Sequence, residues 1–123
     1  MKVRKVDFHG IAKLLEAEGW RTPNTYDETF APIPNRSGIY TLVVHERLLL
    51  TDPFVGYVGK SSNLRQRLTA HPVVSEFGRR LPDCFIQRWF LTLPQNVIAS
   101  AEIAAIRRFN PRANSQHKGW FCG

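Results

Sequence analysis

Cysteine is scarce in this sequence of 123 residues, which contains only Cys84 and Cys122. Two cysteines cannot form the disulfide framework that stabilises many small secreted domains. No apolar run approaches the roughly 20 residues that cross a bilayer, and the basic residues near the N-terminus precede no apolar segment of the kind found in a signal peptide. We therefore expect a cytoplasmic protein that does not enter a membrane.

Several motifs for metals and nucleotides are also missing. No cysteines and histidines have the spacing of a zinc site. Residues Gly59–Ser61 read Gly-Lys-Ser, like the end of a phosphate-binding P-loop, but that motif requires a glycine where this chain has Phe54. The sequence therefore argues against a zinc site and a loop for nucleoside triphosphates, and it contains no internal repeat.

Acidic residues are fewer than basic residues in this sequence. There are 17 Lys and Arg residues against 10 Asp and Glu, a net charge of +7. Residues 41–123 carry eleven basic and five acidic side chains, whereas residues 1–40 carry six and five. An excess of this size predicts a polyanionic partner, and the basic residues form no amphipathic helix of the kind that binds a membrane surface. Nucleic acid is the favoured partner, and an anionic membrane or an acidic protein is the weaker alternative.

The hydrophobic pattern predicts a small α/β (α+β) domain. Short β-branched and apolar runs predict three strands, at residues 38–45, 54–59 and 84–93. Three- and four-residue spacing of apolar side chains predicts helices at residues 6–19, from an N-cap at Ser61 or Ser62 to about Ala70, and at 95–109. We expect a three-stranded antiparallel or mixed sheet flanked by helices, with an extra N-terminal helix.

One globular unit of this size suits a single domain. Residues 1–37 are expected to form the N-terminal helix and an irregular connector packed on the core, and residues 38–123 the remainder of the same unit.

Glu102 is the most informative single residue. It lies midway along the apolar stripe of the last predicted helix, four residues from both Ile98 and Ile106. A carboxylate there is costly unless it reaches solvent, pairs with an arginine, or binds a metal or takes part in acid–base chemistry. These alternatives stay open on the helix alone.

Potential partners precede Glu102 in the chain. Arg67 and His71 are four residues apart and are predicted to share a helix face, from which they could bind a phosphate or simply be solvated. Tyr40 and Tyr57 each lie near a glycine in a predicted strand, where they could be ordinary sheet aromatics or, beside a cation, a general base.

Together these residues resemble the GIY-YIG nuclease family. Residues 38–40 read Gly-Ile-Tyr, the first motif, and residues 57–59 read Tyr-Val-Gly, the second motif with Val for Ile. The arginine, histidine, glutamate and asparagine of the family correspond to Arg67, His71, Glu102 and Asn114. The resemblance covers residues 38–114, and it makes Arg67 and Glu102 more plausible as site residues than as scaffold. The 16 residues between Tyr40 and Tyr57 are more than in compact members, so residues 47–54 lengthen the first hairpin.

The resemblance implies a metal-dependent endonuclease that hydrolyses phosphodiester bonds in DNA. Glu102 would bind one Mg²⁺ or Mn²⁺, and Arg67 would bind the phosphate. Tyr40 would be the base for the attacking water, with Tyr57 positioning the water or phosphate, or the two tyrosine roles exchanged. His71 would assist proton transfer, and Asn114 would brace the site.

Further basic residues are expected to contact the flanking phosphates: Lys60, Arg65, Arg79, Arg80, Arg107, Arg108, Arg112 and Lys118. RNA and branched DNA are additional candidate substrates, and a homodimer or a partner protein could supply specificity. The main alternative is a catalytically inactive nucleic-acid-binding module of the same fold. Restriction, repair, mobile-element and toxin-like roles are not distinguished.

Overall fold

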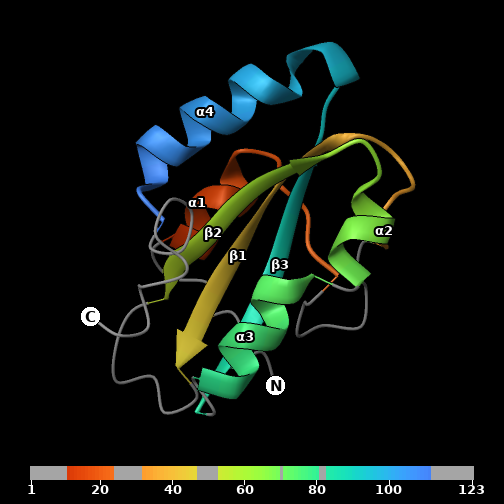
Figure 1. Cartoon of the computed structure of the whole chain (residues 1–123). Coiled ribbons are helices and arrows are strands. Elements are labelled where there is room, and N and C mark those ends of the chain that lie inside the picture. The colour runs from red at the N-terminus through yellow and green to blue at the C-terminus, as the bar shows by residue number, and fades with distance from the viewer. Residues whose placement is uncertain (1–10, 24–31, 47–52, 70, 81–82, 112–123) are drawn as a thin grey trace.

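A three-stranded antiparallel sheet is the centre of the molecule. The computed structural model describes residues 11–23, 32–46, 53–69, 71–80 and 83–111. Its strands are β1 (Gly38–Glu46), β2 (Phe54–Ser61) and β3 (Cys84–Thr92), in the order β2-β1-β3. Both pairings are antiparallel, and helices flank the sheet (Figure 1). The predicted α/β class and three-stranded sheet are confirmed.

Within the described ranges, four α-helices accompany the strands. They are α1 (Ile11–Ala17), α2 (Leu64–Thr69), α3 (Pro72–Arg80) and α4 (Ile98–Phe109), the last entered through a short 3₁₀ turn at Gln95–Val97. The sequence did not predict α3, because Pro72 was interpreted only as a helix stop. Proline ends a preceding helix, but it also suits the first position of the next one, where its missing N–H is not needed.

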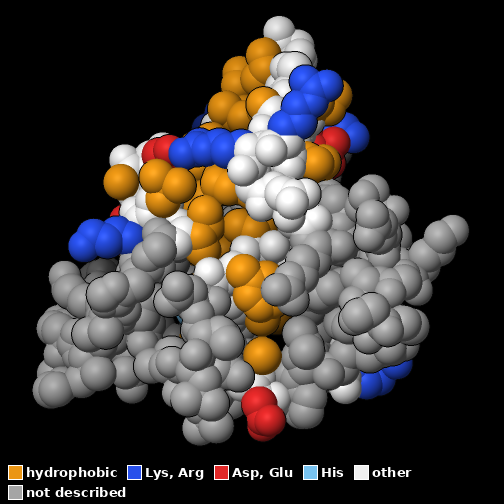
Figure 2. All heavy atoms as spheres, turned by 90° about the vertical axis from the view of Figure 1, so that its left-hand side faces the viewer, with side chains coloured by type: hydrophobic (Ala, Val, Ile, Leu, Met, Phe, Trp, Pro, Cys, Tyr) orange, Lys and Arg blue, Asp and Glu red, His pale blue; other side chains and the backbone are white. Residues whose placement is uncertain are grey.

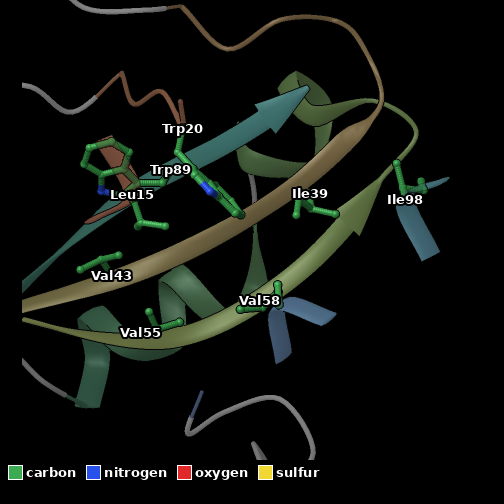
Figure 3. Packing of buried hydrophobic residues seen from close by; sticks show 9 residues of the cluster. Leu15, Trp20, Ile39, Val43, Val55, Val58, Trp89 and Ile98 are labelled. Carbon is green, nitrogen blue, oxygen red and sulfur yellow. The ribbon is translucent and has the colours of Figure 1, made fainter. Parts of the chain in front are cut away.

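The two faces of the sheet carry separate hydrophobic clusters. On one face Ile39 and Val43 of β1 pack with Leu15 and Trp20 from the α1 region and with Ile98 of α4 (Figure 3). On the other face the alternate β1 residues Tyr40, Leu42 and Val44 pack with Leu64 and Leu68 of α2. This alternation follows from the two-residue period of a strand. It places α1 and α4 on one side of β1 and α2 on the side of Tyr40 (Figure 1).

A bulge in β2 changes which residues share a face. Leu42 pairs with Tyr57, but the next residue, Val43, pairs with Val55, so Gly56 is the extra residue. Val55 consequently joins Val58 in the cluster beneath α4. Tyr57 pairs with Leu42 in the regular part of the register and is packed against the cluster that contains Tyr40, so both motif tyrosines lie on one face.

The segment that follows α1 is attached to β3. Arg21 and Phe90 exchange two backbone hydrogen bonds, of 2.9 and 2.8 Å, in an isolated antiparallel bridge. Trp20 is buried and lies edge-on to Phe109 of α4. The α1 region therefore shares the core of the sheet.

None of the helices in the described ranges combines the length and hydropathy required to cross a membrane.

Candidate active site

Tyr40 is the centre of the candidate site. It is the third residue of β1, and only 1% of its surface is exposed. Its cross-strand partner on β2 is Gly59, and a Cβ atom at Gly59 would come within 2.4 Å of the Tyr40 ring and hydroxyl. The glycine of the second motif therefore has a steric purpose, since only a residue without a side chain lets the Tyr40 ring lie across β2.

His71 contacts the Tyr40 hydroxyl from the turn between α2 and α3. Its Nε2 is 2.7 Å from Tyr40 Oη. Its other nitrogen, Nδ1, accepts the backbone N–H of Val73 at 3.0 Å, so the imidazole caps the N-terminus of α3, where backbone donors need partners. Burial, with a smaller contribution from the charge of Arg67, lowers the pKa of His71 to about 4.

These contacts fix the direction of the hydrogen bond. A neutral imidazole whose Nδ1 accepts a hydrogen bond carries its proton on Nε2. His71 therefore donates to Tyr40 rather than accepting its proton. The sequence placed His71 on the same helix face as Arg67, which is wrong, because α2 ends at Thr69; the two side chains nevertheless meet at Tyr40.

Arg67 is the second donor to the same oxygen. Leu64 and Leu68 are buried and attach α2 to the sheet, which leaves Arg67 on the exposed side with its Nε 3.3 Å from Tyr40 Oη. Hydrogen bonding to Tyr40 raises the pKa of Arg67, against the opposing effect of burial. The guanidinium is thus held as a cation beside a phenol.

The Tyr40 oxygen accepts from both His71 and Arg67, so its own hydroxyl hydrogen points in a third direction. Burial raises the pKa of Tyr40 to about 12, while the hydrogen bond from Arg67 opposes that rise. Tyr40 is therefore a phenol at neutral pH, and both donors stabilise the phenolate that forms when the proton leaves.

Tyr57 completes the aromatic part of the site. Its ring lies roughly parallel to that of Tyr40, with centroids 6.2 Å apart and planes at 28°. It also lies edge-on to His71 at 5.1 Å. Tyr57 is only partly buried, so it is more open to solvent than Tyr40.

Glu102 approaches from α4, with 21% of its side chain exposed and its Oε1 3.6 Å from Lys60 Nζ. Its charge is one of the influences that raise the pKa of Tyr40. Of the alternatives left open for Glu102, the structure shows partial exposure to solvent and an ion pair with a lysine within the described ranges. It also shows an electrostatic effect of the carboxylate on Tyr40.

The His, Cys, Asp and Glu side chains of the site can be compared with the ligands that divalent cations require. Across the described part of the chain, no three His, Cys, Asp or Glu side chains gather in a way that could hold a metal. Zinc in a catalytic site usually takes three protein ligands, so these residues do not fit zinc. Mg²⁺ keeps several waters and is commonly bound by one or two carboxylates together with substrate phosphate. Glu102 alone fits that requirement.

The remaining predicted residues have varied surroundings. The Arg65 Nε donates to the Ile33 carbonyl at 2.9 Å. Arg79 forms an ion pair with Glu76, and Arg108 forms one with Glu18 of the segment after α1. Arg107 is exposed. Four predictions lie outside the described part: Arg112, Asn114, Lys118 and the side chain of Arg80.

Two contributors to the site were missed by the sequence analysis. The Val73 backbone N–H fixes the tautomer of His71; the signal was His71-Pro72, since Pro72 has no N–H and the next donor belongs to Val73. Asn63, not Ser61 or Ser62, is the N-cap of α2, because its Oδ1 accepts the Gln66 N–H at 3.1 Å.

A scan against protein-family models, a search of curated proteins and a search of solved structures gave no match to this chain.

Proposed function

We propose that this protein is a metal-dependent endonuclease of the GIY-YIG type that hydrolyses phosphodiester bonds in DNA. The observation that carries the proposal is the convergence of Arg67 and His71 on the oxygen of buried Tyr40. Hydrolysis of a phosphodiester needs a proton acceptor for water beside a cation for the phosphate, and this cluster supplies both.

Tyr40 acts as the base. Hydroxide from the solvent first takes the Tyr40 proton and becomes water, and the hydrogen bonds from His71 and Arg67 stabilise the phenolate that is left. This phenolate then takes a proton from the attacking water. Tyr57, stacked beside it and partly exposed, orients the water or the phosphate.

Arg67 binds the phosphate. Its Nε is used by Tyr40, and the guanidinium has further N–H donors that suit phosphate oxygens. Glu102 would hold Mg²⁺ or Mn²⁺, which when bound neutralises charge on the phosphate and leaving oxygen.

A plasmid-nicking assay with Mg²⁺ tests the proposal. The native chain should nick the plasmid, and Glu102→Gln, which keeps the shape and loses the charge, should not. Glu16→Ala, a change at an exposed carboxylate of α1, should cleave like the native chain. Cleavage that survives both a chelator and Glu102→Gln would overturn the proposal.

A second candidate function is a nucleic-acid-binding module without cleavage. The Lys60–Glu102 ion pair favours it, because the lysine ammonium already balances the carboxylate that would hold the cation. Salt-sensitive DNA binding with no nicking by the native chain would select this function.

A further inference from the structure

Two groups of basic side chains among the described residues differ in what surrounds them. Near α4, Arg108 pairs with Glu18 and stacks over Phe109, with its guanidinium carbon 5.0 Å from the ring centroid. On α3, Arg79 pairs with Glu76. Figure 2 shows the left-hand side of the molecule in Figure 1, where the visible Lys and Arg side chains lie apart among hydrophobic and carboxylate side chains.

The second group surrounds the start of α2. Arg36, Arg65 and Arg67 are all exposed, and we call these three residues the α2 basic surface. Asp and Glu are absent from residues 29–45 and 53–75. Within the described ranges, no carboxylate forms an ion pair with any of the three arginines. Among the described residues no carboxylate compensates their charge, unlike that of Arg79 and Arg108.

Backbone contacts hold this surface together. The Leu64 N–H donates to the Arg36 carbonyl at 2.8 Å, and the Arg65 N–H donates to the Pro34 carbonyl at 3.1 Å. The connector is thus fixed to the first turn of α2, which places Arg36 beside Arg65. Because these carbonyls accept hydrogen bonds from the first two N–H groups of α2, those N–H groups are not available to bind an anion. Any anion bound here must be held by the guanidinium groups.

We propose that the phosphate backbone of the substrate nucleic acid, next to the bond that is cut, lies over the α2 basic surface, with Arg36 and Arg65 as its contacts. The proposal rests on the proposed function, since Arg67 belongs to both the site and this surface. Arg65 and Arg67 are two residues apart and lie on different sides of α2, where Arg67 donates to Tyr40 and Arg65 donates to the Ile33 carbonyl. Helix α2 has six residues and is about 9 Å long, so a nucleic-acid backbone bound at Arg67 passes around this short helix to reach Arg65 and Arg36. No motif or helix pattern in the sequence had selected Arg36.

The test separates binding from cleavage. Binding of a fluorescein-labelled DNA duplex is followed by anisotropy in EDTA over a range of KCl concentrations. The binding constant K falls as salt rises, and loss of one phosphate contact makes the slope of log K against log salt less steep by about 0.9. Arg36→Gln and Arg65→Gln should each show this decrease in steepness. Arg65→Lys keeps the charge and should retain the native slope. It also guards against the explanation that Arg65→Gln merely detaches the connector from α2.

Arg21→Gln, a change at an exposed arginine next to β3, is the matched control and should keep the native slope. Arg107→Gln reports separately on α4, where the sequence analysis also expects a phosphate contact. Unchanged slopes in Arg36→Gln and Arg65→Gln, or equal losses in Arg21→Gln, would overturn the proposal even if the native chain nicks plasmid. The expected slopes in a chain that does not nick would support this surface and reject the hydrolase.

Discussion

At the scale of single residues, the proposed chemistry depends on one phenol oxygen. Tyr40→Phe removes it and keeps the ring that packs against Tyr57. We expect the cleavage rate to fall by roughly 10²–10⁴-fold, the usual contribution of a general base. Because the pKa of Tyr40 is about 12, the phenolate fraction and the native rate should both rise about tenfold per pH unit from pH 7 to 9.

The measurement is the single-turnover rate across that pH range for the native chain, Tyr40→Phe and Tyr57→Phe. Tyr57→Phe should retain the pH-dependent rise. A larger rate loss in Tyr57→Phe, with the pH dependence lost there instead, would exchange the roles of the two tyrosines.

The lowered pKa of His71 predicts how the free energy of unfolding depends on pH. Its pKa is lowered to about 4 in the folded protein from about 6.5 in the unfolded chain. Above pH 6.5 the residue is neutral in both states and contributes no pH dependence. Between pH 6.5 and 4 the unfolded state binds more protons, so the free energy of unfolding should fall as the pH is lowered, by up to about 3 kcal/mol.

Urea unfolding at pH 7 and pH 4.5 measures this loss. His71→Asn is the matched variant, because asparagine can still cap α3 but cannot titrate. The fall in stability should be smaller in His71→Asn than in the native chain. An identical fall in the two proteins would assign the acid sensitivity to other groups.

At the scale of elements, the close approach of β1 and β2 positions Tyr40. Gly59→Ala would place a Cβ 2.4 Å from the Tyr40 ring. We expect it to lower the free energy of unfolding by about 1–3 kcal/mol and to reduce the cleavage rate of the folded molecules, because the hydroxyl must move from Arg67 and His71.

Gly38→Ala is the comparison for that prediction. Its Cβ would meet the Leu91 carbonyl oxygen at 2.3 Å and Leu64 at 2.8 Å, so it strains the sheet without touching Tyr40. Thermal unfolding and single-turnover rates at a temperature where both variants are folded distinguish the effects. Native rates in folded Gly59→Ala would contradict the steric account of the motif glycine.

The same elements show what the sequence could predict. Strands β1, β2 and β3 are recognisable because β-branched and aromatic residues are concentrated in short runs. Helix α3 was missed because a proline such as Pro72 is compatible both with the end of one helix and with the first position of the next. The sheet bulge at Gly56 was also missed, since register depends on the partner strand.

For the candidate site, the residues could be predicted from the sequence but the contacts between them could not. Tyr40, Tyr57, Arg67, His71 and Glu102 could be selected from motif spacing. Their hydrogen bonds could not, because Tyr40 and His71 are 31 residues apart and helix periodicity places His71 on a helix that has already ended. The Lys60–Glu102 pair likewise joins β2 to α4 across 42 residues of sequence.

At the scale of the whole molecule, the α1 region supports the helix that carries Glu102. Trp20 has 6% of its surface exposed and belongs to the core cluster that includes Ile98 and Ala105 of α4. It also lies edge-on to Phe109, with centroids 6.4 Å apart. Arg108 reaches from the same end of α4 to Glu18. If residues 1–37 belong to the same globular unit as the sheet, loss of this contact should lower the free energy of unfolding of the whole domain.

Trp20→Ala tests that expectation. It should lower the free energy of unfolding by roughly 3–5 kcal/mol, the usual cost of removing a buried tryptophan, in a single transition followed by circular dichroism. Leu14→Ala, at a position of α1 with 39% of its surface exposed, should cost far less, because little apolar surface is lost there. A cost in Trp20→Ala as small as that in Leu14→Ala would make the N-terminal region a dispensable attachment. A large cost in one cooperative transition makes it part of the core on which α4, and therefore Glu102, is placed.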